Sequence, residues 1–163
     1  MDIDEMSKYL AQMAAIFLAA YLGSFLALKK FKKERLWDER KAIYKEVIEA
    51  FEELKMWSEY MQASHCCEPT INVNFEFYEA LRVISKRSAI GALFLSKVFQ
   101  RVLEDADVKL SQARFQINEE SRPDVGSEQG RAEWLFILAR EINEIVNEHL
   151  PKLISIAKEE MPK

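Results

Sequence analysis

The most apolar part of the chain is a run near its start. Residues 10–28 read LAQMAAIFLAAYLGSFLAL and contain no charged side chain over nineteen positions. A helix of that length measures about 28 Å, close to the roughly 30 Å hydrocarbon core of a bilayer. A buried core helix normally keeps a polar stripe, whereas this run offers only Gln12, Tyr21 and Ser24. The pattern predicts one transmembrane helix at residues 10–28.

The charges on either side of this run predict its orientation. Residues 1–9 carry one basic side chain, whereas residues 29–41 carry seven Lys or Arg. Because positive charge collects on the cytoplasmic side, residues 1–9 are expected to form an extracytoplasmic tail and the C-terminal part to be cytoplasmic. The tail is acidic, so we expect an anchor rather than a cleaved signal peptide. The side chains expected at lipid headgroups are Lys29, Lys30, Lys32 and Lys33.

Small side chains recur at every fourth position of the same run. Such a ridge lets a second helix backbone approach closely, which is how many membrane helices associate. Alanine is also common in membrane helices that do not associate. We interpret the ridge as a homo-oligomerisation face formed by Ala11, Ala15, Ala19, Gly23 and Ala27.

Beyond the apolar run, hydrophobic positions take helical spacing. No Gly or Pro interrupts residues 28–63, so the transmembrane helix is expected to continue through a basic juxtamembrane segment at 29–41 into a long cytoplasmic helix. The spacing suits either a coiled-coil seam between subunits or the core face of a bundle. The breadth of the stripe favours the bundle; it comprises Trp37, Tyr44, Val47, Ile48, Phe51, Leu54, Trp57 and Met61.

Two polar stretches divide the rest of the chain. Residues 64–74 and 119–129 each contain a proline and no helical pattern, so both are expected to be loops, with Asn74 as the N-cap of the next helix. Residues 75–118 are compatible with one helix, or with two if it pauses at 85–88. A last helix follows, which Pro151 is expected to kink.

These patterns predict an all-α fold, in which the transmembrane helix continues into a cytoplasmic antiparallel helical bundle over residues 42–163. Four Gly and four Pro in 163 residues are too few for the turns of a sheet protein. From Glu34 onward the chain carries 18 basic and 24 acidic side chains. Such a domain lacks the broad positive field that duplex nucleic acid requires.

Residues with catalytic or metal-binding chemistry are few. His65, Cys66 and Cys67 are consecutive, whereas zinc ligands are usually spaced two to four residues apart, so no metal is expected. His149 falls on the apolar stripe of the last helix and is interpreted as a hydrogen-bonded core histidine. The sequence contains no nucleotide-fold, nucleophile-elbow or zinc-protease signature, so we expect neither an enzyme nor a cofactor.

One stretch suits an anionic ligand. If a helix begins at residues 85–88, its free N–H groups lie beside Lys86 and Arg87, and Lys97 and Arg101 add a basic pair four residues apart. The alternative is an exposed polar turn. We interpret these four cations as a candidate ligand-binding set, repeated around the axis of an oligomer.

The architecture as a whole resembles a class of small bacterial membrane proteins. They have one N-terminal helix, a basic stop and a cytoplasmic helical domain, which begins here near Trp37-x-x-Arg40-x-x-x-Tyr44. Some are antiphage effectors, including the type III CRISPR membrane effector gated by cyclic oligonucleotides and the oligonucleotide-controlled Hailong channel. The resemblance implies a homo-oligomeric effector or channel in the bacterial inner membrane, controlled by a cyclic or linear oligonucleotide. The alternative is a passive anchor that recruits a partner protein.

Overall fold

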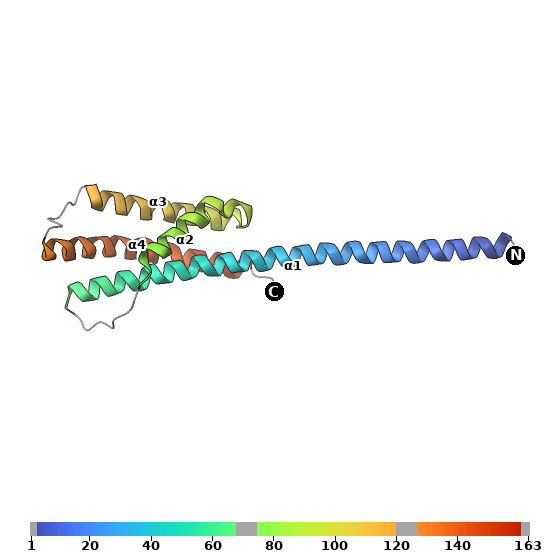
Figure 1. The fold of residues 1–163 in the computed structure, drawn as a ribbon, viewed down its shortest axis with the longest axis horizontal. Helices are drawn as coiled ribbons and strands as arrows, with labels where there is room; N and C mark the ends of the chain where they lie inside the picture. The colour runs from blue at the N-terminus through green and yellow to red at the C-terminus, as the bar shows by residue number, and fades with distance from the viewer. Residues whose placement is uncertain (1–2, 68–74, 120–126, 161–163) are drawn as a thin grey trace. The chain divides into compact units, whose positions relative to one another are not determined.

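The protein is all-helical in the computed structural model (Figure 1), as the sequence predicts. The structure describes residues 3–67, 75–119 and 127–160, without the side chains of residues 3–12, 14, 15, 33 and 116–119. Within these ranges it contains helices and no strand. The elements are α1 (Ile3–His65), α2 (Phe77–Ile90), the 3-10 turn η1 (Gly91–Leu93), α3 (Lys97–Glu119) and α4 (Glu128–Glu160).

The first helix is continuous over 63 residues. This confirms that the apolar run and the amphipathic stretch after it belong to one helix. The chain divides into two compact units, Met1–Glu39 and Arg40–Lys163, so that α1 contributes to both.

In the first unit, every described large apolar side chain of residues 13–28 is exposed. They lie on most sides of the helix, and the remaining side carries the small residues Ala19, Gly23 and Ala27, also exposed. At Gly23 an added methyl group would meet nothing within 4 Å. The large exposed side chains of residues 13–28 are Met13, Ile16, Phe17, Leu18, Tyr21, Leu22, Phe25, Leu26 and Leu28.

In the described part of the chain, no helix is both long enough and apolar enough to cross a membrane. Five residues of the predicted span have side chains outside the description, and they include two of the predicted ridge residues. These are Leu10, Ala11, Gln12, Ala14 and Ala15.

The second unit is an antiparallel bundle. The order of contacts shows the direction of each pair. Along α1, Tyr44 donates a hydrogen bond to Glu160 near the end of α4, and His65 stacks on Phe136 near its beginning. The helices α1 and α4 therefore run in opposite directions.

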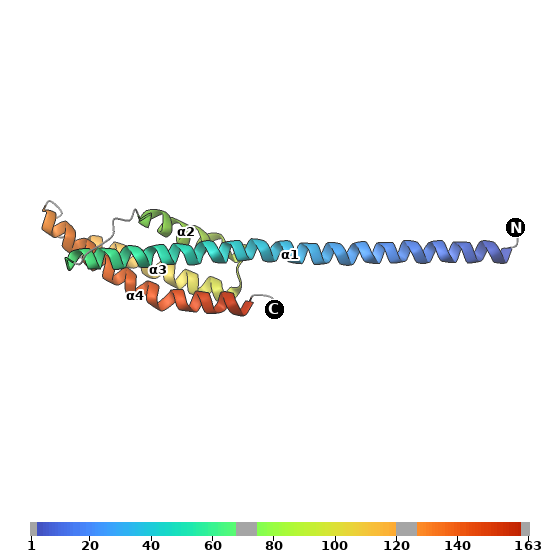
Figure 2. The same cartoon turned by 90° about the horizontal axis from the view of Figure 1, so that it is seen from below.

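The same argument applies to the other neighbours. Arg87 at the end of α2 bonds Glu46 of α1, whereas Phe77 at its beginning stacks on Trp57 further along α1. In α3 and α4, which lie side by side in Figures 1 and 2, Lys109 bonds Glu148 across the pair. The helix α1 is therefore antiparallel to α2 and to α4, and α3 and α4 pack against each other as a pair.

The core of the bundle lies on the predicted stripe of α1. Val47, Phe51 and Leu54 are fully buried, and they meet buried apolar side chains from all three other α-helices. Ile48 and Met61 are partly buried at its edge. The stripe is therefore the face of a core. The buried partners from the other helices include Ile84, Phe99, Leu103, Ile142, Val146 and Leu153.

Residues 75–118 form two helices, which is one of the two alternatives, but the break does not fall at residues 85–88. The helix α2 continues through them to Ile90, and the break falls at η1 and residues 94–96. A methyl group at Gly91 would lie 2.2 Å from Oε1 of Gln100 and 2.5 Å from Cδ1 of Leu95. Side chains from further along the chain thus pack against the backbone at this break, which the pattern of apolar positions does not reveal.

The helix ends also differ in detail from the sequence interpretation. Asn74 lies outside the described residues, and Glu76, which precedes α2, provides no side-chain cap. Cys67 follows the end of α1 with a φ of 59°, the left-handed conformation that terminates helices and favours glycine. Pro151 lies inside α4, which continues to Glu160.

Gly91→Ala is expected to destabilise the bundle. The new methyl group must displace two buried side chains, and overpacking of this kind costs about 1–3 kcal/mol. Urea unfolding of the full chain in detergent micelles, followed by circular dichroism, measures the loss. Gly23→Ala is the matched control, because the same substitution there meets open space. Equal midpoints for Gly91→Ala and the unsubstituted protein would contradict this account of the turn.

Candidate functional site

The four predicted ligand-binding cations differ in their surroundings within one chain. Arg87 is half-buried and its guanidinium bonds Glu46 of α1, so its charge is already paired within the bundle. Lys86, Lys97 and Arg101 are exposed. Residues 85–88 lie in the last turns of α2, so their N–H groups belong to the helix and do not form a phosphate site at a helix start. That part of the interpretation is wrong.

Lys86 lines a hollow on the surface of the bundle. This hollow, of about 440 Å³, lies between α2 and the second half of α3. Its described lining contains three cations and no carboxylate. The lining residues are Tyr78, Leu81, Arg82, Ser85, Lys86, Ala89 and Arg114.

Sequence reasoning missed the other two cations of this hollow. Arg82 is four residues before Lys86 and therefore on the same face of α2, a signal that helical spacing provides. Arg114 comes from α3, where only the antiparallel packing of the two helices brings it to the same place.

A second hollow on α2 has the opposite charge. It measures about 360 Å³ and is formed with α1 rather than α3. Several of its carboxylates have partners, since Glu46 pairs with Arg87 and Glu53 accepts a hydrogen bond from the backbone N–H of Glu76. The two linings differ in charge and meet where Glu79 pairs with Arg82 of the basic hollow. The acidic side chains of the second hollow are Glu46, Glu49, Glu53, Glu76 and Glu79.

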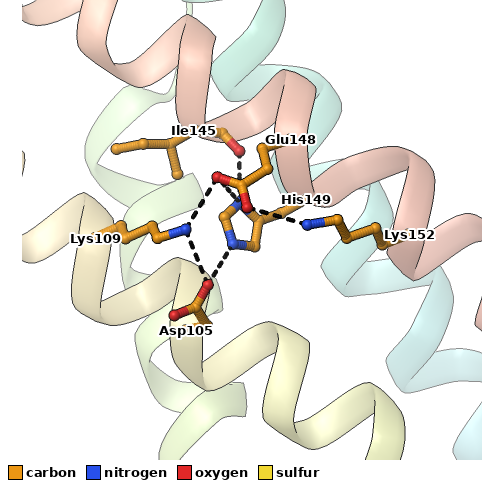
Figure 3. Close-up of polar contacts among 6 residues, drawn as sticks. All are labelled: Asp105, Lys109, Ile145, Glu148, His149 and Lys152. Atoms are coloured by element: carbon orange, nitrogen blue, oxygen red, sulfur yellow. Dashed lines mark hydrogen bonds and ion pairs between the residues drawn. The ribbon is translucent and has the colours of Figure 1, made fainter.

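A charged cluster joins α3 to α4 around a buried histidine (Figure 3). His149 is 1% exposed, which confirms the interpretation of a hydrogen-bonded core histidine. Its Nε2 lies 2.8 Å from Oδ2 of Asp105, and its Nδ1 lies 2.7 Å from the carbonyl oxygen of Ile145. Both ring nitrogens therefore have an oxygen partner, one within α4 itself and one on α3.

Lys109 occupies the space between the two carboxylates of the cluster. Its Nζ lies 3.1 Å from Oδ2 of Asp105 and 2.9 Å from Oε2 of Glu148. The other oxygen of Glu148 accepts a hydrogen bond from Lys152 at 3.0 Å. Hydrogen bonds from Lys109 and Lys152 lower the pKa of Glu148 from 4.5 to about 2. Hydrogen bonds from His149 and Lys109 likewise hold the pKa of Asp105 below its usual value.

Asp105, Glu148 and His149 also have the chemistry of metal ligands. One ligand atom from each lies within 4.8 Å of the others. A metal ion here would compete with the ammonium group of Lys109, which already contacts both carboxylates, and with the contact between Nε2 of His149 and Asp105. The side chains neutralise one another, and we interpret the cluster as a polar connection between α3 and α4.

The residues at the end of α1 form no comparable cluster in the described part of the chain. Cys66 and Cys67 are exposed free thiols. The ring of His65 stacks on Phe136 of α4, with centroids 4.4 Å apart. His65 therefore serves packing between α1 and α4.

No protein-family model matches the chain, and no curated protein or solved structure matches it.

The charged cluster is expected to make the bundle sensitive to acid. Both carboxylates have a lower pKa folded than unfolded, so their contribution to stability is present above the unfolded values of 3.8 and 4.5 and is lost as pH falls, for Glu148 through about 2. Urea unfolding midpoints between pH 6 and pH 2 measure the effect. The double variant Asp105→Asn, Glu148→Gln should flatten this dependence, while Glu144→Gln, an exposed carboxylate of α4, should leave it unchanged.

An equally steep pH profile in the double variant would show that other carboxylates cause the acid sensitivity.

Proposed function

We propose that the protein is a homo-oligomeric membrane effector. Its apolar helix crosses the bilayer once, and the bundle lies on the cytoplasmic side. The observation that carries the proposal is the first unit, where large apolar side chains are exposed on most sides of one helix. Soluble monomers rarely expose so large a contiguous apolar surface, whereas a bilayer covers it at no cost.

The sequence around that helix supports the same arrangement. Residues 10–28 carry no charge, and the basic residues begin immediately after them. Lys29, Lys30 and Lys32 are exposed, as side chains in contact with lipid headgroups would be. The excess of positive charge after the apolar run favours a cytoplasmic bundle.

The small residues supply the reason to propose association. Ala19, Gly23 and Ala27 form a stripe between the large side chains, and open space surrounds the Gly23 position. Two such stripes can bring helix backbones into close contact, where packing rather than the hydrophobic effect stabilises the pair within lipid. A helix that only tethers a domain needs no such stripe.

One form of the proposed effector is a channel like the antiphage channels whose architecture the chain resembles. In such a channel the apolar helices of several subunits surround an axis and open a path through the bilayer when a ligand binds the bundle. The alternative is a passive anchor, whose bundle recruits a partner protein while the helix serves only as a tether.

Membrane insertion is expected to withstand alkaline carbonate washing of cell membranes. Leu18→Glu with Leu22→Glu should release the protein, because each charge at mid-bilayer costs about 2.5–3.5 kcal/mol. Leu36→Glu is the matched control, since Leu36 is also exposed but lies outside residues 10–28. Recovery of the unsubstituted protein in the carbonate supernatant would contradict insertion.

The same cells report orientation. Cys66 and Cys67 are exposed thiols on the bundle, so an impermeant maleimide should label them only after lysis. Cys66→Ser with Cys67→Ser is the control for background. Labelling in intact cells would place the bundle outside and reverse the proposed topology.

Association through the small residues is expected to fail when they are enlarged. Ala19→Leu with Gly23→Leu should dissociate the oligomer, because bulky side chains hold the backbones apart. Ala20→Leu with Ser24→Leu adds leucines one position along the helix and should leave the oligomer intact. Mass photometry of the purified protein measures the assembly, and dye release from liposomes measures conductance. An unchanged assembly in the first variant would remove the ridge as the interface.

The dye assay distinguishes an effector from a passive anchor. If the helix acts as an effector, Ala19→Leu with Gly23→Leu loses dye release together with assembly. A protein that assembles in liposomes and releases no dye, with or without nucleotide, is a passive anchor.

A further inference from the structure

The hollow between α2 and α3 is chemically distinct from the rest of its unit. From Glu34 onward the chain carries more acidic than basic side chains, yet the described lining of this hollow has three cations and no carboxylate. On its other side, toward α1, the same helix lines a hollow with five glutamates. Arg82 of the basic hollow pairs with Glu79 of the acidic one, and Lys86 and Arg114 leave the basic hollow with a local excess of positive charge within an acidic domain.

We propose that this hollow binds a small phosphorylated molecule with an aromatic base, of the size of one nucleotide. Arg82, Lys86 and Arg114 contact the phosphates, and the ring of Tyr78 stacks on the base. The inference deepens the effector function proposed above, because it gives the effector a ligand site that is complete within one chain.

The geometry supports the phosphate contacts. Arg82 and Lys86 are one turn apart on α2, and Arg114 reaches the same hollow from α3, so cations approach from two helices. The guanidinium of Arg82 bonds Glu79 through one nitrogen, at 2.7 Å. Arginine has five N–H donors, and the pair with Glu79 uses one end of its fork. Ser85, between the two cations of α2, adds a hydroxyl donor.

The size and lining support a compact ligand rather than a long polyanion. A volume of about 440 Å³ lies within the range of about 300–1,000 Å³ that is typical of small-molecule sites. Tyr78 lines the hollow, and its large aromatic side chain is mostly exposed to solvent. An exposed ring beside cations is the arrangement on which nucleic-acid bases stack.

Lys97 and Arg101 provide a matched comparison. They are exposed cations four residues apart on α3, but they do not line the hollow. Reversing two charges in the hollow or two charges on this pair changes the net charge of the protein equally. A ligand attracted by general electrostatics responds alike to both changes, whereas a ligand in the hollow responds to one.

The test is calorimetric titration of the full chain in detergent micelles with ATP, AMP, pyrophosphate and glycerol 3-phosphate. ATP is expected to bind saturably. Lys86→Glu with Arg114→Glu should weaken it by about tenfold or more, since each cation contributes charge-assisted hydrogen bonds. Lys97→Glu with Arg101→Glu should change the affinity by less than about threefold, and unchanged circular dichroism shows that both variants are folded.

Tyr78→Ala tests recognition of the base. It should weaken ATP and AMP by about tenfold, as loss of one stacking contact does, and leave pyrophosphate unaffected. Equal losses for the two charge-reversal variants, or no saturable binding of any of the four compounds, overturns the site. Glycerol 3-phosphate binding as tightly as AMP, with no effect of Tyr78→Ala, identifies a phosphate or lipid-headgroup site and overturns the nucleotide assignment.

Micelle measurements do not depend on insertion into a bilayer. A chain that binds ATP in the hollow but is released by carbonate washing retains this site and loses the proposed membrane function. A chain that stays in the membrane and binds none of the four compounds keeps the anchor and loses the site.

Discussion

The C-terminal half of α1 is the surface on which the bundle depends. Each of the other α-helices places an aromatic ring against a ring of α1, and the three contacts are spread along its length. Ring stacking of this kind adds about 0.5–1.5 kcal/mol per pair to the burial of apolar area. It also fixes where along α1 each helix packs. The pairs are Phe99 on Tyr44, Phe77 on Trp57 and Phe136 on His65, with centroids 4.2, 4.0 and 4.4 Å apart.

The parts of the fold that follow from periodicity could be predicted from the sequence. The stripe through Val47, Phe51 and Leu54 identifies the buried face of α1, because one face of a helix must lose its water when a core forms. The break before α3 could not be placed, because the close approach of Gln100 and Leu95 to Gly91 arises only in the folded packing. The periodicity of apolar positions predicts which face of a helix is buried, but it does not predict which side chains of other segments contact that helix.

The same limit applies to the candidate sites. The sequence identifies Lys86 as a candidate, but whether a cation is free to bind a ligand depends on its tertiary partners. Arg87, the next residue, pairs with Glu46 and is engaged in holding α2 to α1. Arg114 enters the hollow only because α3 runs antiparallel to α2. Similarly, the core position of His149 was predictable from the stripe, whereas its partner Asp105 belongs to another helix.

Lys109 supplies the positive charge that balances the carboxylates at the junction of α3 and α4. Two carboxylates and a histidine in one place have the donor atoms of a metal site. Here the counter-ion is covalently part of the chain, with Nζ about equally close to Asp105 and Glu148. A tethered ammonium does not exchange with the solution. The two carboxylates thus have a counter-charge that the chain itself supplies.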